Sequence, residues 1–168
     1  MSLRPVRIYG DPVLRDKAVE VPGVDDTLRQ LIADMRETMK AYGGVGLAAN
    51  QVGVAQRVLI VDVPLDEGER GVHALINPVV KRRVGTLSGE EGCLSLQGVR
   101  VPVERATTVT IEAQDASGAT VTYDLEGYEA RVAQHEFDHL DGVLIIDHTD
   151  DEHRKQALAV LRPRAVLR

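Results

Sequence analysis

Residues 134–139 read Gln134-His135-Glu136-Phe137-Asp138-His139, within a longer segment, residues 127–140, whose apolar side chains recur at helical spacing. Residues four positions apart lie on one face of an α-helix, so His135 and His139 present both imidazoles to the same side. Glu136 lies beside them, as in the H-E-x-x-H pattern, where two histidines bind a metal ion and the glutamate acts on a bound water. The segment therefore predicts a central metal-binding helix.

This helix is expected to be buried along two stripes. The first stripe contains both histidines and the second is apolar. Their members are Tyr128, Val132, His135 and His139 on the first, and Ala130, Ala133, Phe137 and Leu140 on the second. A buried imidazole without a partner is energetically costly, and a metal ion would supply the partner. The alternative, two polar residues on a solvent-exposed face, fits this pattern less well.

A catalytic metal site of this kind uses three protein ligands and keeps one position open for water. Candidates for the third ligand are Cys93, His148, and the carboxylates of the acidic run Asp147–Asp151 or of Glu152. The acidic run follows a predicted strand that leads away from the helix, which favours a solvated cap there. Cys93 is the only cysteine, and Gly92 before it allows close approach of the backbone. Cys93 is therefore the favoured third ligand.

Working outward, the chain combines helical and β-type segments. An amphipathic helix is expected between Val24 and Tyr42, with Thr27 and Gln30 as its capping box and Gly43 after its end. A last helix is expected over Asp151–Leu161. Short apolar and β-branched runs predict strands at Val58–Val63, Ala74–Val80, Val99–Val103, Thr107–Ala113, Thr120–Leu125 and Val143–Ile146.

Three connections are distinctive. Gly43–Gln51 is too rich in glycine for a regular element, although it is more apolar than most surface loops. Pro64–Gly71 is acidic and polar, which predicts an exposed connection, and Asp115–Gly118 predicts a hairpin loop. The whole predicts an α+β fold, a single compact domain over residues 1–168 with mostly antiparallel strands packed around the metal-binding helix.

Composition excludes several classes of function. The 168 residues carry 20 Lys+Arg and 26 Asp+Glu, a formal charge of −6, which is not that of a basic nucleic-acid-binding protein. One Phe, four Tyr and no Trp leave few platforms for stacking single-stranded nucleic acid. A single cysteine suits a reducing compartment. With no signal peptide and no apolar run near the ~18 residues of a membrane span, we expect a cytoplasmic protein without membrane contact.

Three segments stand out together: Gly44-Val45-Gly46-Leu47-Ala48-Ala49-Asn50-Gln51, Glu91-Gly92-Cys93-Leu94-Ser95, and residues 134–139. In order and approximate spacing they resemble the three signature motifs of the peptide deformylases. Tyr9–Arg15 is also similar to the family's opening segment, so the resemblance covers nearly the whole chain. The chain departs from the pattern at Gln97, where the family usually has proline, and in its short C-terminal region.

The resemblance implies a role for each residue of the site. Cys93, His135 and His139 would coordinate the metal, and Glu136 would be the general acid and base. Gln51 and the backbone N–H of Leu94 would form the oxyanion hole. The backbone of Val45, Gly46 and Gly92 would bind the substrate, and Tyr128, Val132 and the His135 ring would line the pocket for the methionine side chain. Glu91 and Arg105 would form an ion pair that supports the site, and Arg100 would be another supporting residue.

The resemblance also implies the reaction and the cofactor. The enzyme would remove the N-formyl group from formylmethionine at the N-terminus of newly made peptides and release formate. One divalent ion per chain would be needed, Fe²⁺ in the cell, with Zn²⁺, Ni²⁺ or Co²⁺ as substitutes. Its partners would be N-formylmethionyl nascent peptides and the ribosome near the exit tunnel, without direct nucleic-acid specificity.

Other functions fit the motifs less well. Gly44-x-Gly46-x-x-Ala49 matches a dinucleotide-binding fingerprint, but it follows a predicted helix instead of a strand. A metallopeptidase with H-E-x-x-H normally takes its third ligand from a downstream His or Glu, whereas the favoured ligand here precedes the helix. A metal-storage protein would have no use for Glu136 and Gln51 beside the metal.

Overall fold

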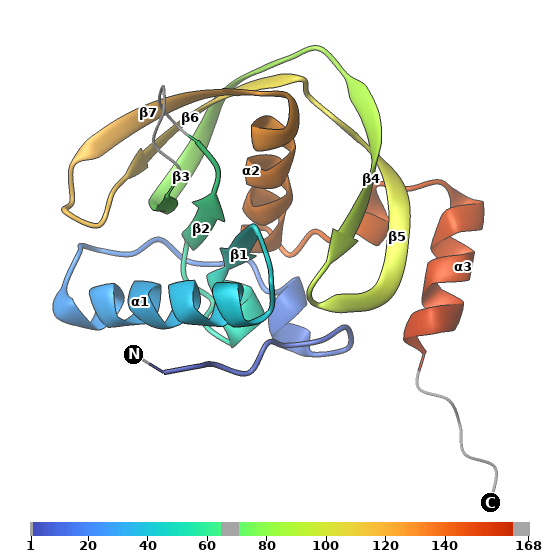
Figure 1. Cartoon of the computed structure of the whole chain (residues 1–168), viewed down its shortest axis with the longest axis horizontal. Coiled ribbons are helices and arrows are strands. Elements are labelled where there is room, and N and C mark those ends of the chain that lie inside the picture. The colour runs from blue at the N-terminus through green and yellow to red at the C-terminus, as the bar shows by residue number, and fades with distance from the viewer. Residues whose placement is uncertain (1, 65–70, 163–168) are drawn as a thin grey trace, which may run out of the picture.

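The computed structural model describes residues 2–64 and 71–162, and its centre is a five-stranded antiparallel sheet in the order β1-β2-β3-β6-β7. The strands are β1 (Gly46–Ala48), β2 (Val58–Asp62), β3 (Val72–Val84), β6 (Thr108–Gln114) and β7 (Thr120–Glu126). A second antiparallel sheet contains β4 (Leu87–Cys93) and β5 (Leu96–Arg105). Helix α2 (Gly127–Leu140) runs between the two sheets, as Figure 1 shows.

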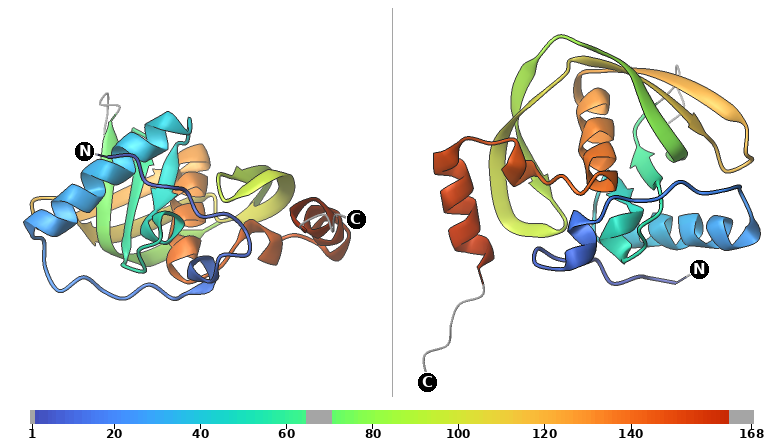
Figure 2. Two further views of the ribbon diagram at one scale, coloured as in Figure 1. Left: turned by 90° about the horizontal axis from the view of Figure 1, so that it is seen from below. Right: turned by 180° about the vertical axis from the view of Figure 1, so that it is seen from behind.

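The large sheet is covered on both faces at strand β2. On β2, Leu59 and Val61 belong to the core that contains α2, whereas Val58 and Ile60 belong to the core that contains α1 (Asp26–Ala41). Figure 2 shows α1 and α2 on either side of the strands. A strand covered on both faces needs apolar residues at every position, which explains the continuous apolar run in β2.

A third core lies behind the small sheet. It joins β5 to the short helices η1 (Pro12–Arg15) and η3 (Ile145–Asp147) and to α3 (Asp151–Leu161). Its buried members are Leu14, Leu96, Val99, Val101, Val103, Leu144, Ile145, Ile146 and Ala157. The small sheet is therefore held between α2 on one side and the C-terminal elements on the other.

The expected elements are largely confirmed. The fold is a single compact α+β domain with antiparallel sheets, and α1, α2, α3 and the strands β2, β3, β5, β6 and β7 lie where the sequence predicts them. The hairpin loop at residues 115–118 joins β6 to β7. Of the expected exposed connection Pro64–Gly71, residues 65–70 lie outside the described residues. In the described part of the chain, no helix is long and apolar enough to cross a membrane.

Three local expectations are wrong. Val143–Ile146 is not a strand, because the carboxylate of Asp147 accepts a hydrogen bond from the Leu144 amide at 2.8 Å and folds the segment into η3. The α1 capping box at Thr27 and Gln30 does not form. Asp25 caps α1 instead, since its side chain accepts from Leu28 N at 2.8 Å.

The third wrong expectation concerns two segments next to the central helix. Gly43–Gln51 contains regular structure after all, the edge strand β1 and the short helix η2 (Ala49–Val52). No strand was predicted at residues 87–93, which are mostly polar and include two glycines. They form β4 through pairing with β5, from Leu87 opposite Arg105 to Gly92 opposite Arg100.

Gly127 is the first residue of α2 and Gly142 follows its end, and we expect substitutions at these two glycines to destabilise the fold unequally. Both have left-handed backbone, with φ +59° at Gly127 and +71° at Gly142. A Cβ at Gly142 would lie 2.8 Å from the carbonyl carbon of Arg15, whereas nothing lies within 4 Å of one at Gly127. We expect Gly127→Ala to lower the free energy of unfolding by about 1–2 kcal/mol, and Gly142→Ala by at least ~3 kcal/mol. Urea unfolding followed by circular dichroism checks this, and equal losses would contradict it.

Candidate active site

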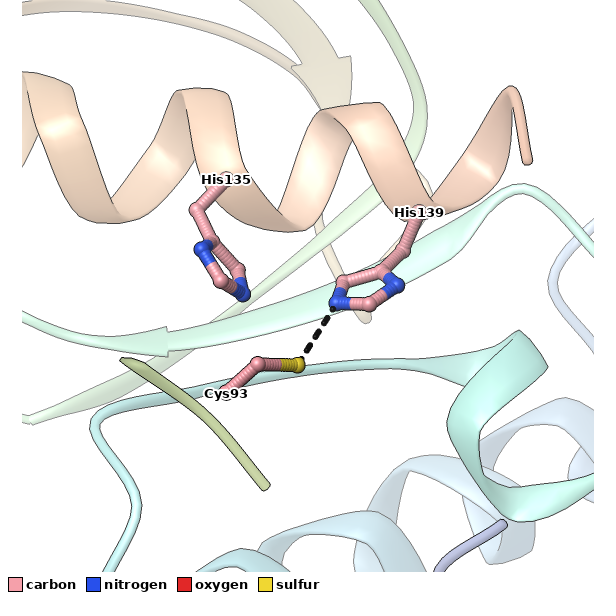
Figure 3. A group of neighbouring side chains, drawn as sticks. All are labelled: Cys93, His135 and His139. Carbon is pink, nitrogen blue, oxygen red and sulfur yellow. Dashed lines mark hydrogen bonds between the residues drawn. The ribbon is translucent and has the colours of Figure 1, made fainter. Parts of the chain in front are cut away.

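The side chains of Cys93, His135 and His139 converge on one point (Figure 3). One ligand atom from each lies within 4.8 Å of the others, and Cys93 Sγ lies 3.4 Å from His139 Nε2. The cysteine ends β4, whereas both histidines project from α2. A thiolate with two imidazoles is a donor set for zinc, iron and related transition metals. These three residues therefore fit a single metal ion.

The predicted third ligand is thus the one that the fold brings to the histidines. His148 instead approaches Asp138, with Nε2 2.8 Å from Oδ2, and Glu152 is exposed in α3. Within residues 2–64 and 71–162, the cluster of Cys93 with the two histidines is the only group of three or more His, Cys, Asp or Glu side chains placed to hold a metal.

Glu91 is the hub that supports this cluster. Its Oε1 lies 2.9 Å from His135 Nδ1 and accepts from Arg105 Nη2 at 2.9 Å. Its Oε2 accepts from Arg105 Nε at 2.9 Å and from Arg131 Nη1 at 2.7 Å. Burial opposes ionisation, but the hydrogen bonds from Arg105 and His135 hold the pKa of Glu91 well below its usual range. Glu91 is therefore a carboxylate that leaves His135 Nε2 free to bind a metal.

The ion-pair network continues along α2. Arg105 is buried and donates from Nη1 to Asp138 Oδ2 at 2.5 Å. Burial opposes ionisation of Asp138, but hydrogen bonds from His148 and Arg105 lower its pKa. The predicted ion pair of Glu91 with Arg105 is present. Arg100 is exposed instead, and its Nε lies 3.7 Å from Glu90 Oε2.

The two metal-ligating histidines have different environments. Burial lowers the pKa of His139 well below its usual value, which keeps this imidazole neutral, as a metal ligand must be. Burial also opposes the charge on His135, but hydrogen bonds with Cys93 and Glu91 raise its pKa well above the usual value. The groups around His135 therefore favour its cationic form more than those around His139 do.

Glu136 is buried beside the cluster. Burial raises its pKa to about 7, and the charges of His135 and Glu91 act in opposite directions on it. Its Oε2 is a buried atom without a hydrogen-bond partner in the described structure. A Cβ on Gly46 would lie 2.6 Å from its other oxygen, so only glycine leaves room for this carboxylate. A carboxyl group with a pKa near 7 can both accept and donate a proton at neutral pH.

Gln51 reaches the cluster from η2 with a fixed amide orientation. Its Oε1 accepts from Ala48 N at 2.9 Å, and its Nε2 donates to Ser95 Oγ at 3.1 Å. Nε2 also lies 3.7 Å from Cys93 Sγ. Because the carbonyl oxygen is held by the backbone, the amide N–H group faces the cluster and can donate to an oxygen there.

A cleft of about 680 Å³ opens onto these groups. It lies between the β1 segment, the β4–β5 hairpin and the first half of α2. The predicted substrate-binding residues all line it, as do Gln51, Glu91, Cys93, Leu94, Arg100, His135 and Glu136; the substrate-binding set is Val45, Gly46, Gly92, Tyr128 and Val132. His139 and Arg105 are buried and do not line the cleft. The residues of one predicted site are thus brought together around a single cleft.

One residue of the site was missed in the sequence. Arg131 lines the cleft and donates to Glu91, although no motif marks it. The available signal was its position, four residues before His135 and thus on the same helical face, among the otherwise apolar residues Ala130 and Val132.

Comparisons with known proteins agree over nearly the whole chain. A family model described as polypeptide deformylase matches residues 3–155. Peptide deformylase 1 of Corynebacterium glutamicum is 46% identical over 166 residues, covering 98% of each chain. The crystal structure of peptide deformylase from Thermotoga maritima superposes with a TM-score of 0.83 at 45% identity, covering 89% of this chain and 99% of that one. The enzyme from Legionella pneumophila gives a TM-score of 0.89 at 37% identity, covering 95% and 94%.

The cluster predicts that metal retention depends on Cys93. Replacing it with alanine leaves two imidazoles, so we expect the Cys93→Ala protein to lose most of its metal during dialysis. When the wild type is loaded with Co²⁺, a thiolate-to-cobalt charge-transfer band should appear, and the variant should lack it. Metal analysis and absorption spectra test both points. Full metal content in Cys93→Ala would mean that another residue is the third ligand.

Proposed function

The chain belongs to the peptide deformylase family, and from this membership and the geometry of the cleft we propose how its residues carry out the reaction. It is a metal-dependent hydrolase that removes the N-formyl group from newly made peptides. The observation that carries the residue assignment is the convergence of Cys93, His135 and His139 beside the buried carboxylate of Glu136. The catalytic unit comprises the whole chain, residues 1–168.

Cys93, His135 and His139 hold the metal. Bound there, a divalent cation lowers the pKa of water and polarises the formyl oxygen. Glu91 supports this arrangement because it accepts from His135 Nδ1, which orients the ring and leaves Nε2 for coordination.

Glu136 moves the protons. Its carboxylate takes a proton from the attacking water and later gives it to the nitrogen of the departing amine. The pKa of about 7 supports both steps, because the group is neither a strong acid nor fully protonated at neutral pH. Glu136 lines the cleft and its Oε2 has no partner in the described structure, so the carboxylate can bind a water that enters the cleft.

Gln51 and the backbone N–H of Leu94 stabilise the formyl oxygen as negative charge develops on it. The fixed amide of Gln51 supports this role, because Ala48 N and Ser95 Oγ hold it in place before substrate binds. Preorganised donors need no rearrangement during the reaction, and one such donor contributes roughly 3–4 kcal/mol to the transition state.

The peptide binds in extended form between β1 and β4. Among the described residues, strand β1 pairs only with β2 in the large sheet, so its other edge can accept a substrate strand. The backbone of Val45, Gly46 and Gly92 provides these contacts, which tolerate different peptide sequences. Tyr128, Val132 and the His135 ring line the cleft for the methionine side chain.

We further propose Fe²⁺ as the ion in the cell, with Zn²⁺, Ni²⁺ or Co²⁺ able to replace it, because a thiolate with two imidazoles accepts all four. The free thiol supports a reducing compartment, and hence the cytoplasm. The substrates are N-formylmethionyl nascent peptides, which the enzyme binds at the ribosome near the exit tunnel. The negative net charge argues against direct nucleic-acid specificity.

The decisive experiment measures formate release from a formyl-methionyl dipeptide by anaerobically purified, metal-analysed protein. We expect turnover by the wild type and none by Cys93→Ala. Hydrolysis of unformylated peptides with the formyl substrate left intact would instead identify a metallopeptidase, and inactivity on both would contradict the reaction.

The role of Glu136 predicts a separation of metal binding from catalysis. Glu136→Ala removes the proton carrier but no ligand, so we expect full metal content with kcat at least ~100-fold lower. Glu136→Gln keeps the shape and should be equally inactive. Atomic absorption and formate assays check this, and unchanged deformylation by either variant would sink the assignment.

Gly46 predicts a steric effect on the same carboxylate. The Cβ of Gly46→Ala would lie 2.6 Å from Glu136 Oε1 and 2.7 Å from its Cγ, so the glutamate has to move. A displacement of this size is expected to lower kcat by about 10- to 100-fold while the metal is retained. Gly23→Ala is the matched control, because nothing lies within 4 Å of a Cβ there. Equal kcat for the two variants would show that Glu136 tolerates the contact.

A further inference from the structure

Arg131 connects α2 to both strands of the small sheet. Its side chain is only 13% exposed and donates to three acceptors. Nη1 donates to Glu91 Oε2 at 2.7 Å and to Val103 O at 2.9 Å, and Nη2 donates to Leu87 O at 2.7 Å. One guanidinium therefore binds a carboxylate and a backbone carbonyl on β4 together with a carbonyl on β5.

We propose that Arg131 is a positioning residue of the deformylase site: it fixes the Glu91 carboxylate that orients His135, and it sets the distance between β4 and α2. Arg131 itself touches neither the metal ligands nor the reacting atoms. The inference rests on the proposed function in that it takes His135 as a metal ligand and the edge of β4 as the substrate wall.

Both oxygens of the Glu91 carboxylate are occupied by donors. Each of its two oxygens has two donors, Arg105 and Arg131 on Oε2, and Arg105 and His135 on Oε1. With Arg131 and Arg105 on Oε2, the carboxylate cannot turn that oxygen toward the histidine. His135 therefore contacts Oε1 alone and donates its Nδ1–H to it, which would leave its Nε2 for a metal ion.

Arg131 also contacts the backbone of β4. Leu87, the first residue of this strand, is bound through its carbonyl, and a Cβ at Gly89 would lie 3.1 Å from Arg131 Cζ. The guanidinium is thus packed directly on β4 at the end opposite to Cys93. Because Gly92 and Cys93 complete the same short strand, a shift at Leu87–Gly89 is transmitted to the substrate wall and to the sulfur ligand.

The geometry requires arginine. A lysine ammonium is a point charge that cannot reach a carboxylate and two carbonyls on different strands at once, whereas the planar guanidinium does. Arg131→Lys therefore keeps the positive charge but loses the planar group with several N–H donors, and Arg131→Met keeps only an apolar side chain.

Arg154 provides a matched control. It also donates to two carbonyls and one carboxylate, from Nε to Ile146 O at 2.8 Å, from Nη2 to Thr149 O at 3.1 Å, and from Nη1 to Asp151 at 3.0 Å. These contacts hold α3 rather than the cleft. Arg154 does not line the cleft, so Arg154→Met tests the cost of losing a comparable arginine outside it.

The experiment compares Zn²⁺-loaded wild type, Arg131→Lys, Arg131→Met and Arg154→Met. For Arg131→Met we expect a 10- to 100-fold weaker Zn²⁺ affinity in competition with a chelator. We also expect a higher KM for the formyl-methionyl peptide. In proton NMR, the Nδ1–H signal of the His135 ring should disappear, because this proton then exchanges with solvent. Arg131→Lys should fall between wild type and Arg131→Met, and Arg154→Met should match the wild type in all three measurements.

The proposal is overturned if Arg131→Met keeps wild-type Zn²⁺ affinity, KM and the protected His135 signal. It is also overturned if Arg154→Met changes them as much, because the effect would then be one of general stability. The outcome is separable from the proposed function: if the wild type releases no formate, that function fails, while the chelator and NMR measurements still decide the role of Arg131.

Discussion

One buried carboxylate, that of Glu91, is shared by Arg105, Arg131 and His135, and the site depends on it. An isolated buried charge would be strongly destabilising, but here four donors compensate it. The same contacts join three elements, since Glu91 belongs to β4, Arg105 to β5, and Arg131 with His135 to α2. The ion-pair network that permits burial of Glu91 is thus also the frame that holds Cys93 opposite the two histidines.

Burial of Glu136 between α2 and β1 raises the pKa of this second glutamate of the site. Strand β1 packs closely against the helix, and the missing side chain of Gly46 leaves space for Glu136. The carboxyl group is enclosed there, so its pKa rises to about 7. Two glutamates of neighbouring elements therefore differ in protonation for a physical reason: Glu91 is surrounded by donors, whereas Glu136 Oε2 lacks a partner in the described structure.

Sequence periodicity predicted the elements whose pattern is set by their own burial. The amphipathic α1, the two-stripe α2 and the apolar runs of β2 and β3 are examples. It was wrong where a single side-chain contact decides the backbone, as at η3, where Asp147 accepts from the Leu144 amide. It also missed β4, whose polar and glycine-rich residues become a strand only through pairing with β5.

The sequence by itself determined the two histidines and Glu136 as a unit, because residues of one helix have a spacing fixed by local geometry. It also marked Cys93, through its uniqueness and its neighbours, as the favoured third ligand. Only the tertiary structure decided that Cys93 approaches His139, 46 residues away, and that His148 does not. It alone revealed what Arg131 binds: the sequence places this residue on the helical face of His135, but it does not show the hydrogen bonds to the backbone of two strands. Contacts of this kind arise only when the packed elements meet.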